Sequence, residues 1–126
     1  MITREQYADY IAAFNRDDFE GFAKFYADDV VLELPTRTLR GRDAILDFYR
    51  EVKKRIRETL KIGQLVIDEE GLAVEADTEF YCKEDWPDFV VKPMKKGESI
   101  RGVSFILYKI RDEKFTHIRS ARFKSF

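Results

Sequence analysis

The sequence contains one cysteine, one histidine and three prolines among its 126 residues. Because Cys82 has no second cysteine to pair with, an internal disulfide is excluded, and His117 alone cannot form the Cys/His cluster of a structural zinc site. Glu75, Asp77 and Glu79 alternate along one predicted strand, but such a row is more typical of a solvated face than of a metal site. We therefore expect no metal and no cofactor, and a fold that depends on packing alone.

An excess of charge of either sign is also missing, since 23 Lys and Arg residues face 24 Asp and Glu residues. Non-specific binding to nucleic acid or to anionic lipid needs a basic excess, so neither is an expected partner. No apolar run approaches the roughly 20 residues of a membrane helix, and the first residues, MITREQYADY, lack the apolar stretch of a secretory signal. These absences favour a cytoplasmic protein.

Apolar residues are plentiful, at 44% of the chain, and 14% of the residues are aromatic. This composition and length fit one domain that covers residues 1–126 and has its own core. No repeat, low-complexity tract or linker divides the chain.

In the first half of the chain, apolar residues recur at helical spacing. Thr3 and Gln6 form a capping-box pattern before a first helix, and Asp17 and Glu20 repeat it before a short second helix that ends at 28–29. A strand over 30–34 follows. Gly41 then opens a third helix with an apolar stripe that runs to residue 56, and we expect its opposite, basic face to be solvated; that face carries Arg50, Lys53, Lys54 and Arg57.

From residue 59 onward the apolar period changes from 3.6 to 2, which predicts strands over 60–67, 72–82, 100–110 and 115–123. The segment 83–97 contains two prolines and Trp86, so we expect a loop or lid there. Three helices followed by an antiparallel meander make an α+β domain, with the helices packed on one face of a curved antiparallel sheet. The strand over 100–110 is apolar on both faces, so we expect a homodimer that covers its outer residues, Val103, Phe105 and Leu107.

The order of elements and four local strings resemble the NTF2-like superfamily, in particular its SnoaL-like and ketosteroid-isomerase-like branch. The strings are YIAAFNRDDFEGFAKFYADD, VVLELP, GRDAILDFY and SFILYKIRDEKFTHIRSARF. The resemblance implies a cone, in which a curved sheet wraps around the helices and leaves a mainly apolar cavity open at one end. Members of the superfamily include isomerases, dehydratases, epoxide hydrolases, polyketide cyclases and proteins that only bind or assemble, so the fold alone does not assign a reaction.

The residues that ketosteroid isomerases use are present only in part. Tyr10 matches the helix-one tyrosine that stabilises a developing enolate in those enzymes, but Leu34 stands where their general base precedes a proline. The stretch 104–108 carries no carboxylate to match their second acid, and the stretch 116–123 carries none to match the base of polyketide cyclases. Isomerisation by the family's usual mechanism is therefore disfavoured.

Three residues are candidates for catalysis. Tyr10 has the family position but could also be a core residue, and His117 titrates near neutral pH but could be structural or exposed. Arg122 would need an anion inside an apolar cone, or it could lie at the rim. Alternation groups Thr116 with Ile118, Ser120 and Arg122 on the cavity face, although a bulge would exchange the two faces. We expect the ligand to be bound by Tyr10, Phe14, Phe80, Trp86, Ser104, Tyr108, Ile118 and Arg122.

Three functions remain open at this point. The first is a protein that binds a small apolar or aromatic molecule, with an acid–base reaction on it that the sequence does not assign. The second is a non-catalytic binder or carrier, and the third is a dimeric accessory domain with a vestigial cavity. The absence of both usual carboxylates shifts the weight from catalysis toward binding. A buried carboxylate with a raised pKa in the cavity would favour the first, a wholly apolar cavity the second and a filled cone the third.

Overall fold

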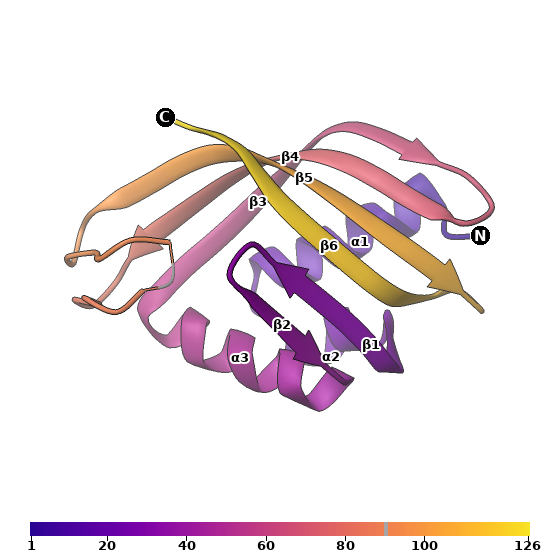
Figure 1. Ribbon diagram of the computed structural model, residues 1–126, viewed down its shortest axis with the longest axis horizontal. Helices are drawn as coiled ribbons and strands as arrows, with labels where there is room; N and C mark the ends of the chain where they lie inside the picture. The colour runs from indigo at the N-terminus through magenta and orange to yellow at the C-terminus, as the bar shows by residue number, and fades with distance from the viewer. Residues whose placement is uncertain (90) are drawn as a thin grey trace.

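One six-stranded sheet bends around three helices, which lie on its concave side (Figure 1). The computed structural model describes residues 1–89 and 91–126. None of the helices in these ranges is long and apolar enough to cross a membrane. The elements are α1 (Arg4–Asn15), α2 (Phe19–Ala23), β1 (Tyr26–Leu34), β2 (Arg37–Arg40), α3 (Arg42–Arg55), β3 (Ile56–Ile67), β4 (Gly71–Cys82), β5 (Ser99–Arg111) and β6 (Lys114–Ser125).

The strands follow the order β2-β1-β6-β5-β4-β3. Strands β3 to β6 form the predicted antiparallel meander, and the α+β class is confirmed. The expectation of a wholly antiparallel sheet is wrong, because β1 pairs with β6 in parallel. The hairpin of β1 and β2 thereby extends the sheet beyond its last strand.

The first helix begins as its sequence predicts. The Thr3 hydroxyl accepts a hydrogen bond from the backbone N–H of Gln6 at 3.1 Å, and the Gln6 side chain accepts one from the Thr3 N–H at 2.8 Å. This reciprocal pair satisfies two N–H groups that the helix leaves unbonded. The buried stripe that the spacing predicts faces the sheet and consists of Tyr7, Tyr10, Ile11 and Phe14.

The second helix is shorter than predicted, and its cap is Asp18 rather than Asp17. The Asp18 carboxylate accepts a hydrogen bond from the Gly21 N–H at 3.0 Å. The chain is already extended at Tyr26, where β1 begins beside Phe115 of β6. The helical spacing of apolar residues continues in the sequence to Tyr26, but pairing with β6 makes Tyr26 a strand residue instead.

The third helix also ends earlier than its apolar stripe. It stops at Arg55, and Ile56 is the first residue of β3, paired with Cys82 at the end of β4. Residues 56–58, which fit the helical spacing, are strand residues because the long β4 offers them a partner.

The basic face of α3 is not uniformly solvated, since Lys53 is 4% exposed. Its ammonium group donates hydrogen bonds to the carboxylate of Asp17 at 2.7 Å and to the carbonyl oxygen of Phe14 at 2.8 Å. It also lies 3.9 Å from the centre of the Phe14 ring. Lys53 thus ties α3 to the turn that links α1 and α2, where Asp17 has a φ of 59°.

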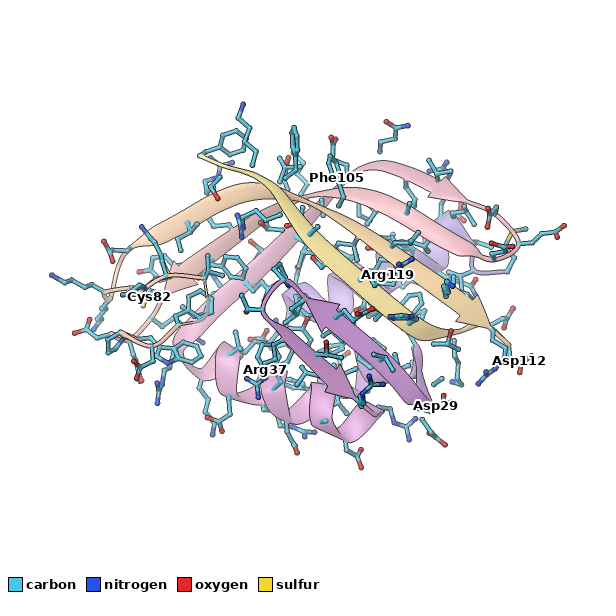
Figure 2. All side chains as sticks on the ribbon, in the orientation of Figure 1. Asp29, Arg37, Cys82, Phe105, Asp112 and Arg119 are labelled. Carbon is cyan, nitrogen blue, oxygen red and sulfur yellow. The ribbon has the colours of Figure 1, made fainter. Side chains whose placement is uncertain are left out.

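The sheet is two-sided, as the alternation predicts. The inner residues of β4 and β5 are buried against the helices, whereas Phe105 and Leu107 on the outer side are 46% and 40% exposed. Figure 2 shows Phe105 projecting from the convex side of the sheet, away from the helices. A register shift near the start of β6 places both Phe115 and Ile118 among the buried residues. The bulge that the sequence left open is therefore present near the start of β6, and a second register shift lies between Arg122 and Lys124 near its end.

We expect Asp17→Asn to lower the free energy of unfolding by about 1–3 kcal/mol, because the buried Lys53 ammonium would lose its only carboxylate partner. Asparagine tolerates the positive φ of this position, so the backbone should not change. Chemical denaturation measures the effect. The control is Asp47→Asn, which removes an exposed partner of Arg50 on α3 and should change stability by less than about 0.5 kcal/mol. Equal stability of the two variants would contradict the role of Lys53.

Candidate functional site

A cavity of about 310 Å³ lies between the concave face of the sheet and helices α1 and α3. Its walls are mostly apolar and aromatic, with contributions from α1, β1, α3 and the four strands of the meander. The lining residues that are exposed to solvent are Pro35 and Thr36, in the turn between β1 and β2, and Val91 in the loop between β4 and β5. These two segments mark the mouth of the cavity.

Most residues of the predicted ligand site line this cavity. The residues placed there are Tyr10, Phe14, Phe80, Ser104, Tyr108, Ile118 and Arg122. Trp86 and His117 are not among the lining residues. Leu34, which stands at the position of the usual base, contributes an apolar side chain to the wall.

His117 lies on the outer side of the sheet and pairs with Glu33. The parallel contact of β1 with β6 brings the two strands together, and the His117 ring nitrogen Nε2 is hydrogen-bonded to the Glu33 carboxylate. His117 therefore has a structural partner, Glu33, which the sequence did not identify. His117 is not positioned to act on a molecule inside the cavity.

Trp86 lies behind the cavity wall, in the segment 83–97, of which Val90 is outside the described residues. The Trp86 ring packs 5.0 Å from the ring of Phe89, and the Arg55 guanidinium lies 5.0 Å from the Trp86 ring. Phe89 itself lines the cavity and lies 5.5 Å from Phe80. A contact of Trp86 with a ligand would therefore be transmitted through Phe89.

Arg122 reaches across the neighbouring strand into the cavity. It is paired with Ser104 of β5, and its guanidinium lies 5.4 Å from the ring of Phe80. The guanidinium needs Gly102 beneath it, since a Cβ atom there would lie 2.0 Å from Nη1 of Arg122. This nitrogen is buried and has no hydrogen-bond partner among the residues that the structure describes. A buried unsatisfied donor of this kind costs about 1–3 kcal/mol.

Glu58 is the residue that the sequence did not reveal. It lies near the start of β3, is paired with Phe80, and is the only carboxylate that lines the cavity in the described part of the chain. Burial raises the pKa of Glu58 from its ordinary value of 4.5 to about 7, against the opposing effects of the charges on Lys53 and Arg122. The remaining accessible surface of this half-buried side chain faces the cavity.

The sequence hides Glu58 because residues 45–56 fit a helical stripe so well that the strand is expected to begin only at residue 59. A different signal was present: Ile56, Glu58, Leu60 and Ile62 alternate, so an acid interrupts an otherwise apolar strand face. That face becomes the cavity wall.

Buried tyrosines supply further polar atoms, beside the hydroxyl groups of Thr78, Ser104 and Ser120. The hydroxyl groups of Tyr10 and Tyr26 lie 2.8 Å apart, and those of Tyr7 and Tyr108 are also 2.8 Å apart. Burial raises the pKa of all four phenols, so they stay protonated at neutral pH. Within each pair only one O–H can donate to the other. Because both Tyr10 and Tyr26 line the cavity, their pair keeps one hydrogen-bond donor that a ligand oxygen can use.

A sequence profile of the SnoaL-like domain matches residues 7–118, nearly the whole chain. The chain belongs to the SnoaL-like family. No curated protein sequence matches it significantly. The resemblance to the NTF2-like superfamily that the sequence indicated is thus confirmed.

Solved structures share the fold of this SnoaL-like domain at low sequence identity. A protein from Catenulispora acidiphila with a ketosteroid-isomerase-like fold, in complex with trimethylamine, is 15% identical, with a TM-score of 0.76 over 95% of this chain and 86% of that chain. An NTF2-like protein of unknown function from Burkholderia pseudomallei is 17% identical, with a TM-score of 0.76 over 94% and 88%. An M. tuberculosis LEH-like epoxide hydrolase is 15% identical, with a TM-score of 0.76 over 94% and 80%.

The environment of Glu58 predicts a specific dependence of stability on pH. Since its pKa is higher in the folded chain, the native state binds more protons than the unfolded state between pH 4.5 and about 7, and stability falls as the pH rises through this window. The shift corresponds to about 3 kcal/mol.

Glu58→Gln removes this titration. The unfolding free energy of the variant minus that of the unchanged chain should therefore grow by about 3 kcal/mol between pH 4.5 and 7 and stay constant above it. Denaturant titrations at half-unit pH intervals measure it, with the exposed Glu69→Gln as control. A difference that is flat across the window would show that Glu58 is not desolvated.

Proposed function

We propose that this SnoaL-like domain is an enzyme that binds a small, mainly apolar or aromatic molecule in the cavity and moves a proton on it, with Glu58 as the acid–base group. The observation that carries the proposal is Glu58, the one carboxylate among the described residues that line this mainly apolar cavity, with a pKa that burial raises to about 7. A group that titrates near the working pH exists in both protonation states and can accept and return a proton in one cycle.

The donor at Tyr10 and Tyr26 complements Glu58. Glu58, Tyr10 and Tyr26 all line the cavity, and the charge of Glu58 raises the pKa of both tyrosines. A substrate oxygen bonded to this donor would be stabilised as negative charge develops on it, while ionised Glu58 takes a proton from a neighbouring carbon or from a water molecule. Neutral Glu58 would then return the proton.

The alternatives are less well supported by the shape and chemistry of the site. A dimeric accessory domain with a vestigial cavity would be expected to have a filled cone, whereas a volume of about 310 Å³ is open between sheet and helices. A non-catalytic binder of a neutral apolar molecule gains nothing from a desolvated carboxylate, which costs stability at neutral pH. Two proteins of this fold are precedents. The M. tuberculosis protein is an epoxide hydrolase, and the protein from Catenulispora acidiphila binds trimethylamine.

Glu58→Gln is expected to lower the proton-transfer rate by about 10²–10⁴-fold. Two probe reactions suit the cavity: exchange of the α-hydrogens of 2-indanone in deuterium oxide, followed by proton NMR, and hydrolysis of styrene oxide. If Glu58 acts as the base, the rate should rise with pH and level off above about 7. Glu69→Gln should retain full activity, because this exposed residue lies in the turn between β3 and β4. Equal rates for both variants in both reactions would reject the role of Glu58.

We also propose that two chains pair through the convex face of the sheet. Phe105 and Phe123 pack against each other with ring centres 5.1 Å apart, and they are 46% and 66% exposed. Together with Leu107 and Val66 they form an apolar surface that a single chain leaves in water. Val103, the third residue of the predicted contact, is half-buried at its edge.

Phe105→Glu should give monomers or aggregates, because a carboxylate would be buried at the centre of the contact. Light scattering coupled to gel filtration at micromolar concentration measures the mass. Ser99→Glu adds the same charge at the exposed start of β5 and should leave the mass unchanged. A monomer for the unchanged chain would reject the dimer.

A further inference from the structure

Arg122 brings a positive charge into the cavity without a partner of opposite charge in contact with it. In the described residues, no ion pair or side-chain hydrogen bond satisfies its guanidinium, and Nη1 is buried without any partner. The contact that the guanidinium does make is with the face of the Phe80 ring. A desolvated cation of this kind is stabilised strongly by an anion that enters the same cavity.

The position of Arg122 is built into the strands rather than left to a flexible side chain. Gly102 leaves the space that the guanidinium occupies, and this glycine is paired with Thr78 of β4. The guanidinium is thereby directed over Phe80, the residue that pairs with Glu58 on β3. Arg122 and Glu58 thus face the same space from opposite sides of Phe80.

We propose that the ligand of this cavity is a small organic acid bound as its anion, with its carboxylate paired to Arg122, and that binding adds a proton to Glu58. The proposal rests on the proposed function, since it assigns the substrate class of that same cavity. An anion at Arg122 competes with the Glu58 carboxylate for Arg122, the one cation among the described residues that line the cavity. The ionisation HA → A⁻ + H⁺ is complete in solution before binding, and the buffer takes up that proton. The proton that Glu58 gains on binding, –COO⁻ + H⁺ → –COOH, therefore also comes from the buffer.

The other charged and titratable groups around Glu58 favour this coupling. Lys53 of α3 is already bonded to Asp17 and to the Phe14 carbonyl, so it is not available to a ligand. Asp17 opposes a negative charge on Glu58, and Tyr10, Tyr26 and Tyr49 remain neutral near pH 7. Among the described residues that line the cavity, Glu58 is therefore the group that can change its charge near neutral pH in response to an anion. Tyr108, which also lines the wall, stays protonated as well.

The test compares two ligands of the same shape by isothermal titration calorimetry between pH 6 and 8.5. The probes are 2-naphthoate, which is ionised throughout this range, and the neutral 2-naphthamide. At pH 6 the acid should bind at least about tenfold more tightly than the amide. Its affinity should fall by up to about tenfold per pH unit above 7, while that of the amide stays constant. Titrations at pH 7.5 in two buffers of different ionisation enthalpy should show uptake of up to about three-quarters of a proton with the acid, because about a quarter of Glu58 is already protonated at this pH before binding.

Four variants identify the groups responsible. Arg122→Met should abolish the preference for the acid, whereas Arg119→Met, on the outer face of the same strand, should keep it. Glu58→Gln should keep the preference but lose both the pH dependence and the proton uptake. Arg122→Lys retains the charge and should retain part of the preference, which guards against a variant that fails to fold.

Equal affinity for acid and amide, an acid affinity that does not change with pH, or no binding of either probe at millimolar concentration would each overturn the proposal. The outcome is separate from that of the proposed reaction. Selective binding of the acid without any Glu58-dependent turnover would reject the reaction and leave the ligand class standing. Glu58-dependent turnover of neutral substrates with no preference for acids would reject the ligand class alone.

Discussion

A single helix joins the two opposite edges of the sheet, and the shape of the cavity depends on that connection. Strand β2 is one edge and β3 the other, and α3 links them with only Gly41 before it and no residue after it. A helix of 14 residues is about 21 Å long, whereas six flat strands would span about 24 Å. The helix is thus about as long as the sheet is wide, and it crosses the concave side of the curved sheet from one edge to the other (Figure 1). The cavity lies between this concave face and helices α1 and α3.

The same connection explains why an acid ends in an apolar wall. Because β3 begins immediately after α3, its first residues lie under the helix, where the concave face is most enclosed. Ile56 fills that space with hydrocarbon, but Glu58, two residues further on, places a carboxylate there. Its charge is tolerated only because Lys53 and Arg122 lie near enough to lower its pKa, and even their combined effect does not offset the desolvation.

The sequence determined the fold more completely than the site. The capping box of α1, the alternation in β4 and the apolar faces of β5 depend on local spacing, and each is found as predicted. The parallel pairing of β1 with β6 and the short strand β2 depend on which distant segments meet, and local spacing carries no information on that. Glu58 was missed for a related reason. It lies just after the junction of α3 and β3, where the sequence fits both the helical spacing of 3.6 residues and the strand spacing of 2.

Moving the acid from the end of β1 to the start of β3 changes what the cavity can do. At the usual position before the proline, Leu34 now makes the wall near the mouth apolar. In the proposed reaction Glu58 would act instead from β3, an edge strand of the sheet, where the charges of Lys53 and Arg122 partly oppose the rise in its pKa. A proton would therefore be transferred at a different part of a bound molecule than in an enzyme whose base follows β1. One fold can serve several reactions when the scaffold stays the same and the acid moves to another strand. The curved sheet allows this because it offers inward-facing positions on every strand.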